Sequence, residues 1–436
     1  MHKKGFHCNP SRKITHTPSI SSKTLLSLQS VVTKKLIIII GGGASGFFSA
    51  INAAINFPKT KIIILEKSNK ILSKVKISGG GRCNVTHHCF ENNELIKNYP
   101  RGEKELRQVF SQFSVQDTID WFLKRGVKLK VEPDGRMFPE SNSSETIVNC
   151  FLSEAQKHDI NINLEEEVLS IDKSEKDVLI VKTNKQTYIA HAVICSIGGH
   201  HQIKNYQFLK NCGHTIDNLI PSLFTLNLPQ SNIKELMGLS VKNGTVKVNG
   251  TKHQYTGPVL ITHWGLSGPA VLKLSAFAAY DFYKLNYEAG ISVNWTGTLN
   301  EEQLKEELSL QLGSKALLVN TPLFEIPKRL WEYLVLRSDI STTKPWIELG
   351  KKQLNKLAQV LTNDVYDMKG KTTFKEEFVT AGGINLKEVN FKTMESKLVP
   401  HLFFCGEVLN IDGITGGFNF QNAWSTAYIA AKNVLN

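Results

Sequence analysis

The sequence predicts an α/β fold in which a dinucleotide-binding Rossmann domain is interrupted by an inserted domain, β-rich first and helical second. Three observations lead to this prediction. An apolar strand, LIIII, enters GGGASG, and a helical segment and a second apolar strand follow. Strand-like patterns then fill residues 222–298, and helical patterns fill 299–368. Features of nucleotide binding return only near the C-terminus, where two glycines precede the last helix.

The first glycine segment has the spacing that a bound pyrophosphate requires. We expect Gly41 to make the tight turn, Gly43 to let the backbone approach the phosphates, and Gly46 to let the helix pack against the strand. The helix N-terminus would then offer N–H groups and a positive dipole to the phosphates. Glu66 follows Gly46 by 20 residues, where a carboxylate can bind the ribose of adenosine. The plain alternative is a glycine turn without a ligand.

The next segments complete the first part of this domain. SGGGRCN is a second glycine-rich turn that can wrap a cofactor, because glycine permits close backbone approach. One helix is predicted over 103–125, a strand pair around the turn at 133–135, a helix over TIVNCFLSEAQKH, and three strands that end at Gly198 and Gly199. His200 and His201 follow as a solvated turn.

In the middle of the chain, Asn249-Gly250 predicts a hairpin turn, and the following GPVLITHWGLSGPAVLKLS is strand-like. Asn300 or Thr298 is a candidate cap for the first helix of the helical part. Near the C-terminus, FVTAGGI is extended and LFFCGE is a strand that places Glu407 against a sugar hydroxyl. Gly416 and Gly417 put positive dipole at the start of the last helix, which would stabilise an anionic reduced flavin.

These patterns divide the chain into five segments. Residues 1–33 are basic, rich in Ser and free of acids, which indicates a disordered tail, a dispensable extension from an over-long gene start, or a transit peptide. The FAD-type domain is predicted in two parts, with the β and helical parts of the insertion between them; the segments are 34–200, 201–298, 299–374 and 375–436.

The composition excludes several classes of protein. The seven cysteines form no C-x-x-C pair, so neither a disulfide framework, a zinc site nor any other metal site is expected. The longest apolar runs are far shorter than a membrane span, and the tail lacks the apolar core of a secretory signal. We therefore expect a cytoplasmic protein without a membrane segment.

The net charge of +13 invites a nucleic-acid hypothesis. The first 35 residues supply seven of the basic residues and no acid, which leaves +6 for the rest. Residues 59–82 contain a second concentration of basic residues and a single acid, Glu66. The basic residues are Lys59, Lys61, Lys67, Lys70, Lys74, Lys76 and Arg82. These residues bind the phosphates of the cofactor, form a solvated face, or bind a polyanionic partner.

The motifs GGGASG, SGGGRCNVT, DGRMFP, THWGLSGPA, FVTAGGI, TMESK and GEVLNIDGITGGFNFQNAWS, taken together, resemble the BaiN/RdsA family of FAD-dependent oxidoreductases, also labelled aminoacetone-oxidase-like flavoproteins. The resemblance extends over residues 35–436. It implies a glutathione-reductase-like FAD-binding Rossmann domain, interrupted by an inserted β domain and a small helical subdomain. That implication agrees with the segments derived from the patterns.

The resemblance also implies a set of FAD contacts. The pyrophosphate would lie on the first glycine loop, and the adenosine on the acid after the second strand and on a backbone group. The remainder of FAD would lie on the second glycine turn and the last helix. The residues of this set are Gly41, Gly43, Ala44, Ser45, Gly46, Glu66, Lys67, Gly80, Gly81, Arg82, Cys83, Asn84, Val168, Gly406, Glu407, Gly417, Phe418 and Asn419. The family usually has Asp at Asn410, Gly at Ser73, Arg at Lys74 and Asn at His87. The missing acid at 410 argues against a proton-transfer role there.

Members of this family reduce different substrates. The resemblance implies reduction of FAD by NAD(P)H and hydride transfer to an activated alkene, either a uridine of 23S rRNA, giving dihydrouridine, or a bile-acid intermediate. Only one dinucleotide fingerprint is present, so NAD(P)H would visit the flavin transiently. His263 and Cys83 are the candidate catalytic acids, with structural roles as the alternative. The basic balance favours rRNA; a small-molecule ene-reductase or amine oxidase, and a flavin-containing RNA- or ribosome-binding module, stay open.

Overall fold

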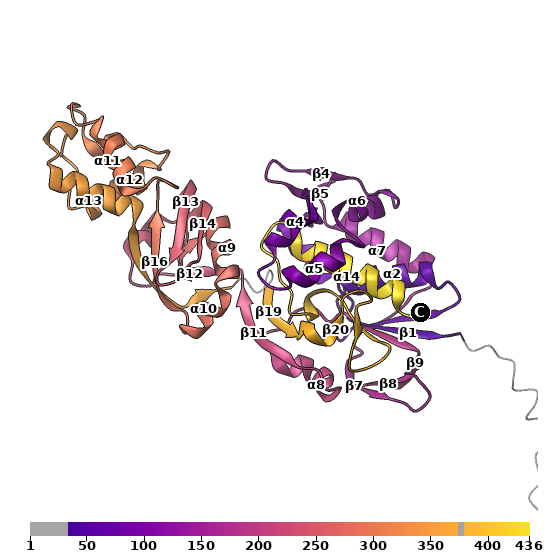
Figure 1. The fold of residues 1–436 in the computed structure, drawn as a ribbon. Helices are drawn as coiled ribbons and strands as arrows, with labels where there is room; N and C mark the ends of the chain where they lie inside the picture. The colour runs from indigo at the N-terminus through magenta and orange to yellow at the C-terminus, as the bar shows by residue number, and fades with distance from the viewer. Residues whose placement is uncertain (1–33, 374–378) are drawn as a thin grey trace, which may run out of the picture.

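The computed structural model describes residues 34–373 and 379–436. The predicted tail over 1–33 and the junction at 374–378 lie outside the described residues. Two bodies of packed structure are joined by a narrow connection (Figure 1). One body is built from both ends of the described chain, and the other from its middle (Figure 1).

A seven-stranded sheet forms the centre of the first body. Four of its five parallel strands carry apolar runs, and Ile37, Ile38 and Ile39 are completely buried. Such runs are typical of a parallel sheet that is covered on both faces. In order across the sheet the strands are β20 (Val389–Asn390), β21 (Glu395–Ser396), β22 (Leu402–Phe404), β10 (Ala192–Cys195), β1 (Leu36–Ile40), β2 (Lys61–Leu65) and β6 (Asn161–Asn163).

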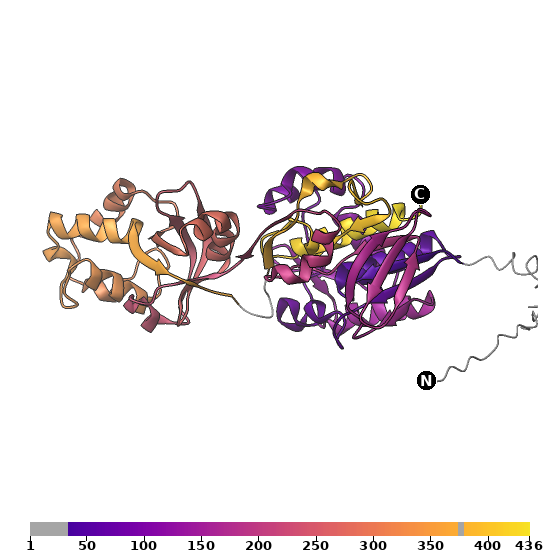
Figure 2. The same cartoon turned by 90° about the horizontal axis from the view of Figure 1, so that it is seen from below.

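Helices cover one face of this sheet, and a small antiparallel sheet covers the other (Figures 1 and 2). The Phe48 ring on the first helix packs against Trp121 and Trp424, with ring centroids 4.4 and 5.3 Å apart. These contacts hold together segments from opposite ends of the chain. The helices are α2 (Ala44–Asn56), α5 (Glu103–Phe110), α6 (Val115–Leu123), α7 (Glu145–Lys157) and α14 (Phe418–Asn433); the small sheet contains β7 (Val168–Lys173), β8 (Leu179–Thr183) and β9 (Thr187–Ala190).

Two expectations for this body are wrong in detail. The helix predicted over 103–125 is two helices, because Ser114 and Asp117 form a capping box that starts α6 afresh. The three strands predicted up to residue 199 are five, since the first of them is two strands, β6 and β7, and the second is the β8–β9 hairpin. The predicted strand pair is confirmed as β4 (Leu129–Val131) and β5 (Arg136–Pro139).

The connection between the bodies is a pair of antiparallel strands, β11 (Ile216–Ser222) and β19 (Val379–Ile384). One strand leads into the second body and the other returns from it (Figure 1). Their pairing runs from Ile216 opposite Ile384 to Ser222 opposite Val379. The two segments that connect the bodies are thereby hydrogen-bonded into one two-stranded ribbon.

A second seven-stranded sheet, entirely antiparallel, forms the core of the other body. Its hydrophobic core is separate and contains the fully buried rings of Trp295, Trp331 and Trp346. The strands, in order, are β17 (Asp364–Lys369), β16 (Glu288–Asn294), β13 (Ser240–Val248), β14 (Gln254–Ile261), β15 (Gly265–Ser267), β12 (Thr225–Asn227) and β18 (Lys371–Thr372).

Local signals explain where the helices of this body begin. Asn300 caps the first helix of the helical part in a capping box with Gln303, as predicted, and the Asn249-Gly250 turn joins β13 to β14, also as predicted. The strand-like interpretation of the segment after Gly268 is wrong, because Pro269 at the first helical position starts a helix. The helices are α9 (Pro269–Phe277), α10 (Ala279–Lys284), α11 (Glu301–Ser309), α12 (Lys328–Arg337) and α13 (Lys351–Thr362).

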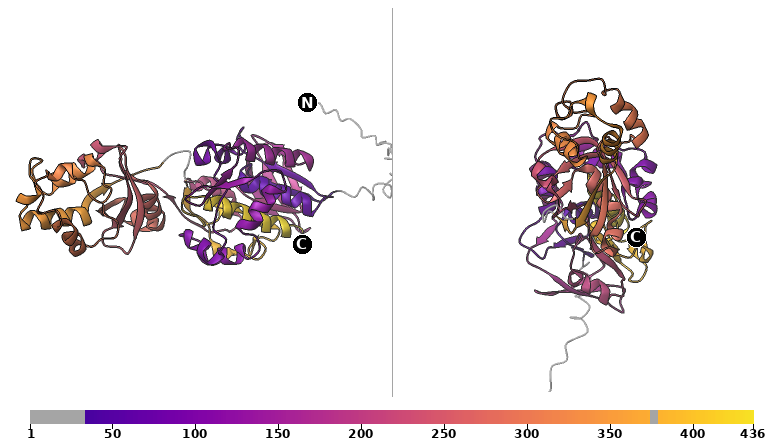
Figure 3. Two further views of the ribbon diagram at one scale, coloured as in Figure 1. Left: turned by 90° about the horizontal axis from the view of Figure 1, so that it is seen from above. Right: turned by 90° about the vertical axis from the view of Figure 1, so that its left-hand side faces the viewer.

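Seen from above, the second body lies beyond one end of the first, and in the end-on view it lies in front of the first (Figure 3). Within residues 34–373 and 379–436, no helix has both the length and the apolar character needed to cross a membrane. The same residues contain no group of three His, Cys, Asp or Glu side chains that could hold a metal ion.

Candidate functional site

The first glycine loop lies between β1 and α2 and has the geometry expected of a phosphate cradle. Gly41 has φ +108°, and a Cβ there would lie 2.5 Å from the Ser196 carbonyl oxygen. A Cβ at Gly46 would overlap the Gly41 carbonyl oxygen. Gly43, by contrast, faces open space. Two glycines are therefore required by packing, and the third leaves room for a ligand.

The N-terminus of α2 opens into that room. Gly43 is the N-cap and provides no side-chain hydrogen bond, so the amides of Ala44, Ser45 and Gly46 at the first turn are not used by the helix itself. Their dipoles favour an anion. Ser45 also packs against the C-terminal part of the chain, since a Cβ at Gly406 would lie 2.6 Å from its hydroxyl.

Glu66, directly after β2, closes the loop on its other side. Its carboxylate accepts hydrogen bonds from the N–H groups of Gly42 at 2.8 Å and Ser68 at 2.9 Å. Beside it lies a cavity of about 290 Å³. The cavity is lined by residues of four segments, namely Ile40, Gly41, Leu65, Glu66, Lys67, Glu166, Glu167, Val168, Leu169, Ile197, His200, Lys204, Asn205, Gln207 and Phe208. The three residues predicted on the adenosine side, Glu66, Lys67 and Val168, thus line one cavity.

His200 was expected in a solvated turn, and the structure corrects that expectation. The ring is half-buried in the cavity wall, with Nε2 3.1 Å from the Ile197 carbonyl oxygen. Burial, followed by the charges of Lys67 and Lys74, lowers the pKa of His200 to about 4. The ring is therefore neutral near pH 7. Lys67 itself donates to Asn205 at 2.9 Å across the cavity.

The second glycine turn ends a kinked helix, α3 (Ser73–Gly81). Gly79 and Gly80 have φ of +59° and +68°, and Gly80 and Gly81 face open space. Cys83 follows with its side chain completely buried, and burial raises the pKa of its thiol to about 12. Arg82 is held by Glu132 at 3.1 Å.

Asn84 connects this turn to the last helix. With its amide oxygen toward Gly417 it accepts the Gly417 N–H at 3.0 Å and donates to the Thr86 carbonyl at 3.0 Å. Gly417 is the N-cap of α14 and has φ +96°. The Asn419 side chain closes the preceding loop by bonding both backbone groups of Gly413, at 2.8 and 2.9 Å. The Tyr99 hydroxyl donates to the Phe418 carbonyl at 2.7 Å. The N-terminus of α14 is consequently fixed beside the second glycine turn.

Glu407 lies in the 3₁₀ turn Gly406–Val408, close to both glycine segments. Its two oxygens accept from the Lys74 ammonium at 2.6 Å and from the Thr380 N–H at 3.1 Å. A Cβ at Gly199 would lie 2.6 Å from the same carboxylate. Thr380 is completely buried, and its hydroxyl has no hydrogen-bond partner within the described residues. A buried hydroxyl without a partner is expected to bind a ligand or water.

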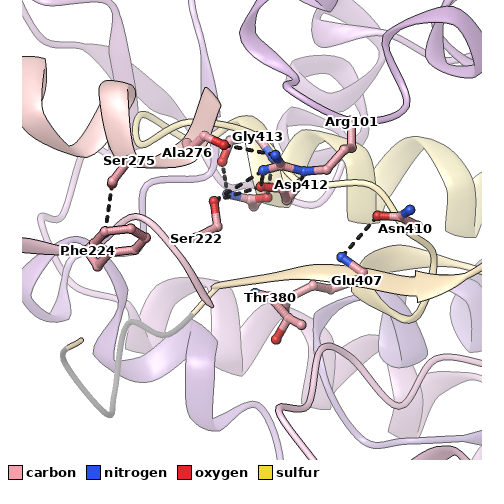
Figure 4. A network of polar contacts seen from close by, with 12 residues as sticks. Arg101, Ser222, Phe224, Ser275, Ala276, Thr380, Glu407, Asn410, Asp412 and Gly413 are labelled. Atoms are coloured by element: carbon pink, nitrogen blue, oxygen red, sulfur yellow. Dashed lines mark hydrogen bonds and ion pairs between the residues drawn. The ribbon is translucent and has the colours of Figure 1, made fainter. Parts of the chain in front are cut away.

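A buried network lies where the connecting ribbon meets the first body (Figure 4). Arg101 donates to both oxygens of Asp412, to the Ala276 carbonyl at 2.9 Å, and to Ser222 at 3.4 Å. Ser222 also donates to Asp412 at 2.8 Å. Asp412 is completely buried, and burial raises the pKa of its carboxyl. One guanidinium therefore joins the first body, the ribbon and α9 of the second body.

Asn410, where the family usually has Asp, is placed by the same ribbon. Its amide oxygen accepts the Gly382 N–H at 3.0 Å, and its amide nitrogen donates to Asp217 at 2.7 Å. An Asp at this position would put a second carboxylate against Asp217. The neutral amide is thus matched to its neighbour in this chain.

The structure does not bring the two candidate acids together. Cys83 is buried behind the second glycine turn, whereas His263 is exposed on the turn between β14 and β15, with its ring centroid 4.8 Å from that of Trp264. Several members of the basic concentration find partners within the chain: Lys67, Lys74, Lys76 and Arg82 contact Asn205, Glu407, Glu145 and Glu132.

Sequence reasoning missed Arg101, Asp412, Thr380 and Asn205. Arg101 and Asp412 are 311 positions apart, and Lys67 and Asn205 are 138 apart, so no local spacing relates them. The acid in GEVLNIDG was the one available signal for the buried pair.

Comparisons with known proteins show the family of the chain. The HI0933-like protein Rossmann domain family matches residues 35–433. The chain is 30% identical over 416 residues to the ribosomal RNA dihydrouridine synthase of Escherichia coli (strain K12), covering 91% of this chain and 97% of the relative. It is 26% identical over 404 residues to the 3-dehydro-bile acid delta(4,6)-reductase of Clostridium scindens, covering 90% and 97%.

Among solved structures, the chain resembles 3-ketosteroid delta1-dehydrogenase from Sterolibacterium denitrificans. The TM-score is 0.50 at 12% identity, covering 92% of this chain and 99% of the other. At that identity the likeness shows the fold alone. It supports the predicted class, a Rossmann-type FAD-binding fold with an insertion.

Proposed function

The chain belongs to the HI0933-like family, a family of flavin-dependent oxidoreductases, and on that premise we propose that it uses NAD(P)H and FAD to reduce a carbon–carbon double bond in a uridine of 23S ribosomal RNA. The observation that carries the proposal is the near-complete match, over 97% of its length, to a relative named for dihydrouridine synthesis in ribosomal RNA. The same match is accompanied by a cradle that fits FAD.

The fit rests on three features of the described chain. Two helix N-termini, those of α2 and α14, open toward glycines, and Gly43, Gly80 and Gly81 leave space beside them. The cavity beside Glu66 is suited to an adenosine. The Thr380 hydroxyl is a buried group that still needs a partner. When bound, FAD would supply the redox chemistry, accepting hydride from NAD(P)H and delivering it to the double bond.

The residues of the chain would position the cofactor and the substrate. The α2 amides would bind the pyrophosphate, Glu66 the adenosine ribose, and Glu407, held by Lys74, the ribityl hydroxyls. Proton delivery to the second carbon is assigned by hypothesis to His263 or Cys83. The raised pKa of Cys83 makes it a poor acid near pH 7, and His263, exposed on the inserted body, could donate a proton only to a substrate that spans both bodies.

A small-molecule substrate is the second candidate, because the bile-acid reductase is matched over 97% of its own length as well. The basic composition favours the polyanion. NAD(P)H has no second dinucleotide fingerprint in the chain, so we infer that it approaches the flavin from the substrate side.

Mass spectrometry of ribosomal RNA tests the proposal. Deleting the gene in its host should remove dihydrouridine from 23S rRNA, and the wild-type chain should restore it, while a chain that cannot bind FAD, Gly46→Ala, should not. If dihydrouridine persists in the deletion strain, rRNA is not the substrate. If purified protein holds FAD that NAD(P)H fails to bleach, the reductase assignment is itself wrong.

A further inference from the structure

We propose that the turn Thr262–Trp264, between β14 and β15, is a stacking platform for unpaired nucleotides of the RNA substrate. This inference rests on the proposed function and deepens it, because it names a second part of the protein that binds the same RNA. The platform lies on the inserted body and is distinct from the glycine loops described above.

The exposure of Trp264 is unusual for this chain. All six tryptophans lie in the described residues. Five of them are 6% exposed or less, whereas the Trp264 side chain is 46% exposed. The chain otherwise uses tryptophan as a core residue. The inference starts from this ring because tryptophan is enriched where it contacts a partner.

The turn presents this ring rigidly. The Thr262 hydroxyl accepts from the N–H groups of Trp264 and Gly265 at 3.3 and 3.2 Å, and the Trp264 carbonyl accepts from the Leu228 N–H at 2.8 Å. Gly265, with φ +151°, lies so close to Leu226 that a Cβ would overlap the Leu226 carbonyl oxygen. A fixed aromatic plane loses little entropy when a ligand stacks on it.

Apolar and cationic groups surround the turn. Met237 is 63% exposed, and the next residue, Gly238, donates its N–H to Ile261 at 2.9 Å, one residue before the turn. The Lys234 ammonium donates to the Pro229 carbonyl at 2.5 Å. Pro229 directly follows Leu228, whose N–H donates to the Trp264 carbonyl.

Lys234 lies in the 3₁₀ turn Asn232–Leu236. A second cation contacts this turn, since Arg329 donates to the Glu235 carbonyl at 3.2 Å. The neighbouring charges are exposed Glu235, exposed Lys328, and Lys242, which pairs with Glu325 at 2.9 Å. The segments that contain these groups thus carry four cations, Lys234, Lys242, Lys328 and Arg329, and two acids, Glu235 and Glu325.

This combination fits single-stranded RNA. Aromatic rings stack unpaired bases without regard to sequence, and nearby cations neutralise the phosphates between them. His263 adds a second ring, tilted by 45° to Trp264 with centroids 4.8 Å apart, so two adjacent bases can be accommodated. Lys234 and Arg329 contact backbone carbonyls in the described residues, and a purely apolar partner would bring their charges no counter-ion.

Fluorescence quenching of the FAD-loaded full-length protein is the first test. Because Trp264 is the exposed tryptophan, acrylamide should quench it first, and oligouridylate should protect it from acrylamide. The duplex of oligouridylate with oligoadenylate should protect it less. NADPH at the same concentration is the further arm, and protection by NADPH alone would assign the turn to the pyridine nucleotide and overturn the inference.

A matched pair of variants is the second test. Trp264→Ala should weaken oligouridylate binding roughly tenfold or more, the loss expected when one stacked base is released. Tyr283→Ala, on α10 of the same body and 45% exposed, should leave binding unchanged. Lys234→Gln should reduce the salt dependence of binding by about one counterion. Unchanged flavin content and thermal unfolding of Trp264→Ala would show that it is folded.

The outcomes separate this inference from the proposed function. If Trp264→Ala binds RNA as tightly as the wild type and restores dihydrouridine in the deletion strain, the platform is refuted and the proposed function stands. If Trp264→Ala changes the sedimentation of the free protein from dimer to monomer, the turn is a contact between copies, and the inference is again wrong. Loss of RNA binding in Trp264→Ala, with Tyr283→Ala intact, supports it.

Discussion

Removing the Arg101 guanidinium tests how the two bodies are held together. In Arg101→Met the Asp412 carboxylate, completely buried, keeps only the Ser222 hydroxyl as a side-chain donor, at 2.8 Å (Figure 4). The Ala276 carbonyl loses its Arg101 donor at the same time. The substitution therefore leaves one buried charge and one carbonyl without their main partner.

The expected loss follows from that count. Stranding one member of a buried ion pair costs about 3–5 kcal/mol in the free energy of unfolding. The lost hydrogen bond to Ala276 adds about 1 kcal/mol. Burial already raises the pKa of Asp412, so in the variant the stranded carboxyl takes up a proton more readily, and the loss should shrink as the pH falls.

Urea unfolding of the FAD-free protein measures this loss, with circular dichroism and tryptophan fluorescence fitted separately because the chain has two cores. Arg136→Met is the matched control, because its partner Asp134 is exposed and such pairs contribute about 0–1 kcal/mol. Arg101→Met/Asp412→Leu should recover much of the stability, since an apolar pair can replace a buried ion pair. An Arg101→Met loss no larger than that of Arg136→Met would refute the reasoning.

Two further predictions concern the nucleotide cradle. Gly46→Ala should abolish FAD retention during gel filtration, because its Cβ overlaps the Gly41 carbonyl oxygen. Gly213→Ala is the control: a Cβ there meets open space but φ is +93°, so this variant should lose stability and keep FAD. For FAD-free protein, stability should fall between pH 6.5 and about pH 4, because the folded pKa of His200 lies below its unfolded value and the unfolded chain binds the proton first. His200→Gln should flatten that part of the curve, and an unchanged slope would contradict the assignment.

Local patterns predicted the first βαβ unit because each of its requirements is met within about thirty residues. Gly46 is needed by a steric contact inside that unit, with the Gly41 carbonyl oxygen, whereas the contact that requires Gly41 is with Ser196, outside the unit. The spacing of the motif therefore predicts the unit, although one of its contacts is distant. The capping box at Asn300 and the Asn249-Gly250 turn are of the same kind. Interactions that close within one turn or one loop can be predicted from the sequence.

Features that depend on distant segments could not be predicted in this way. The ribbon pairs Ile216 with Ile384, and the guanidinium of Arg101 meets Asp412 across 311 positions. The alternation of β17, which is buried at every second residue from Asp364, was hidden at the end of a helical region. For the segment after Gly268, apolar content favoured a strand, and a proline at the first helical position decided for a helix.

The ribbon connects the position of the inserted body to the cofactor cradle. On β19, the Thr380 N–H holds Glu407 and the Gly382 N–H holds Asn410; at the end of β11, Ser222 holds Asp412. All three partners belong to the segment that leads into the glycines before α14. A displacement of the inserted body would therefore act first on the hydrogen bonds to Glu407, Asn410 and Asp412 (Figure 4). Because these contacts are direct, the inserted body is linked to the segment before α14 through the ribbon itself, and not only through the parallel sheet.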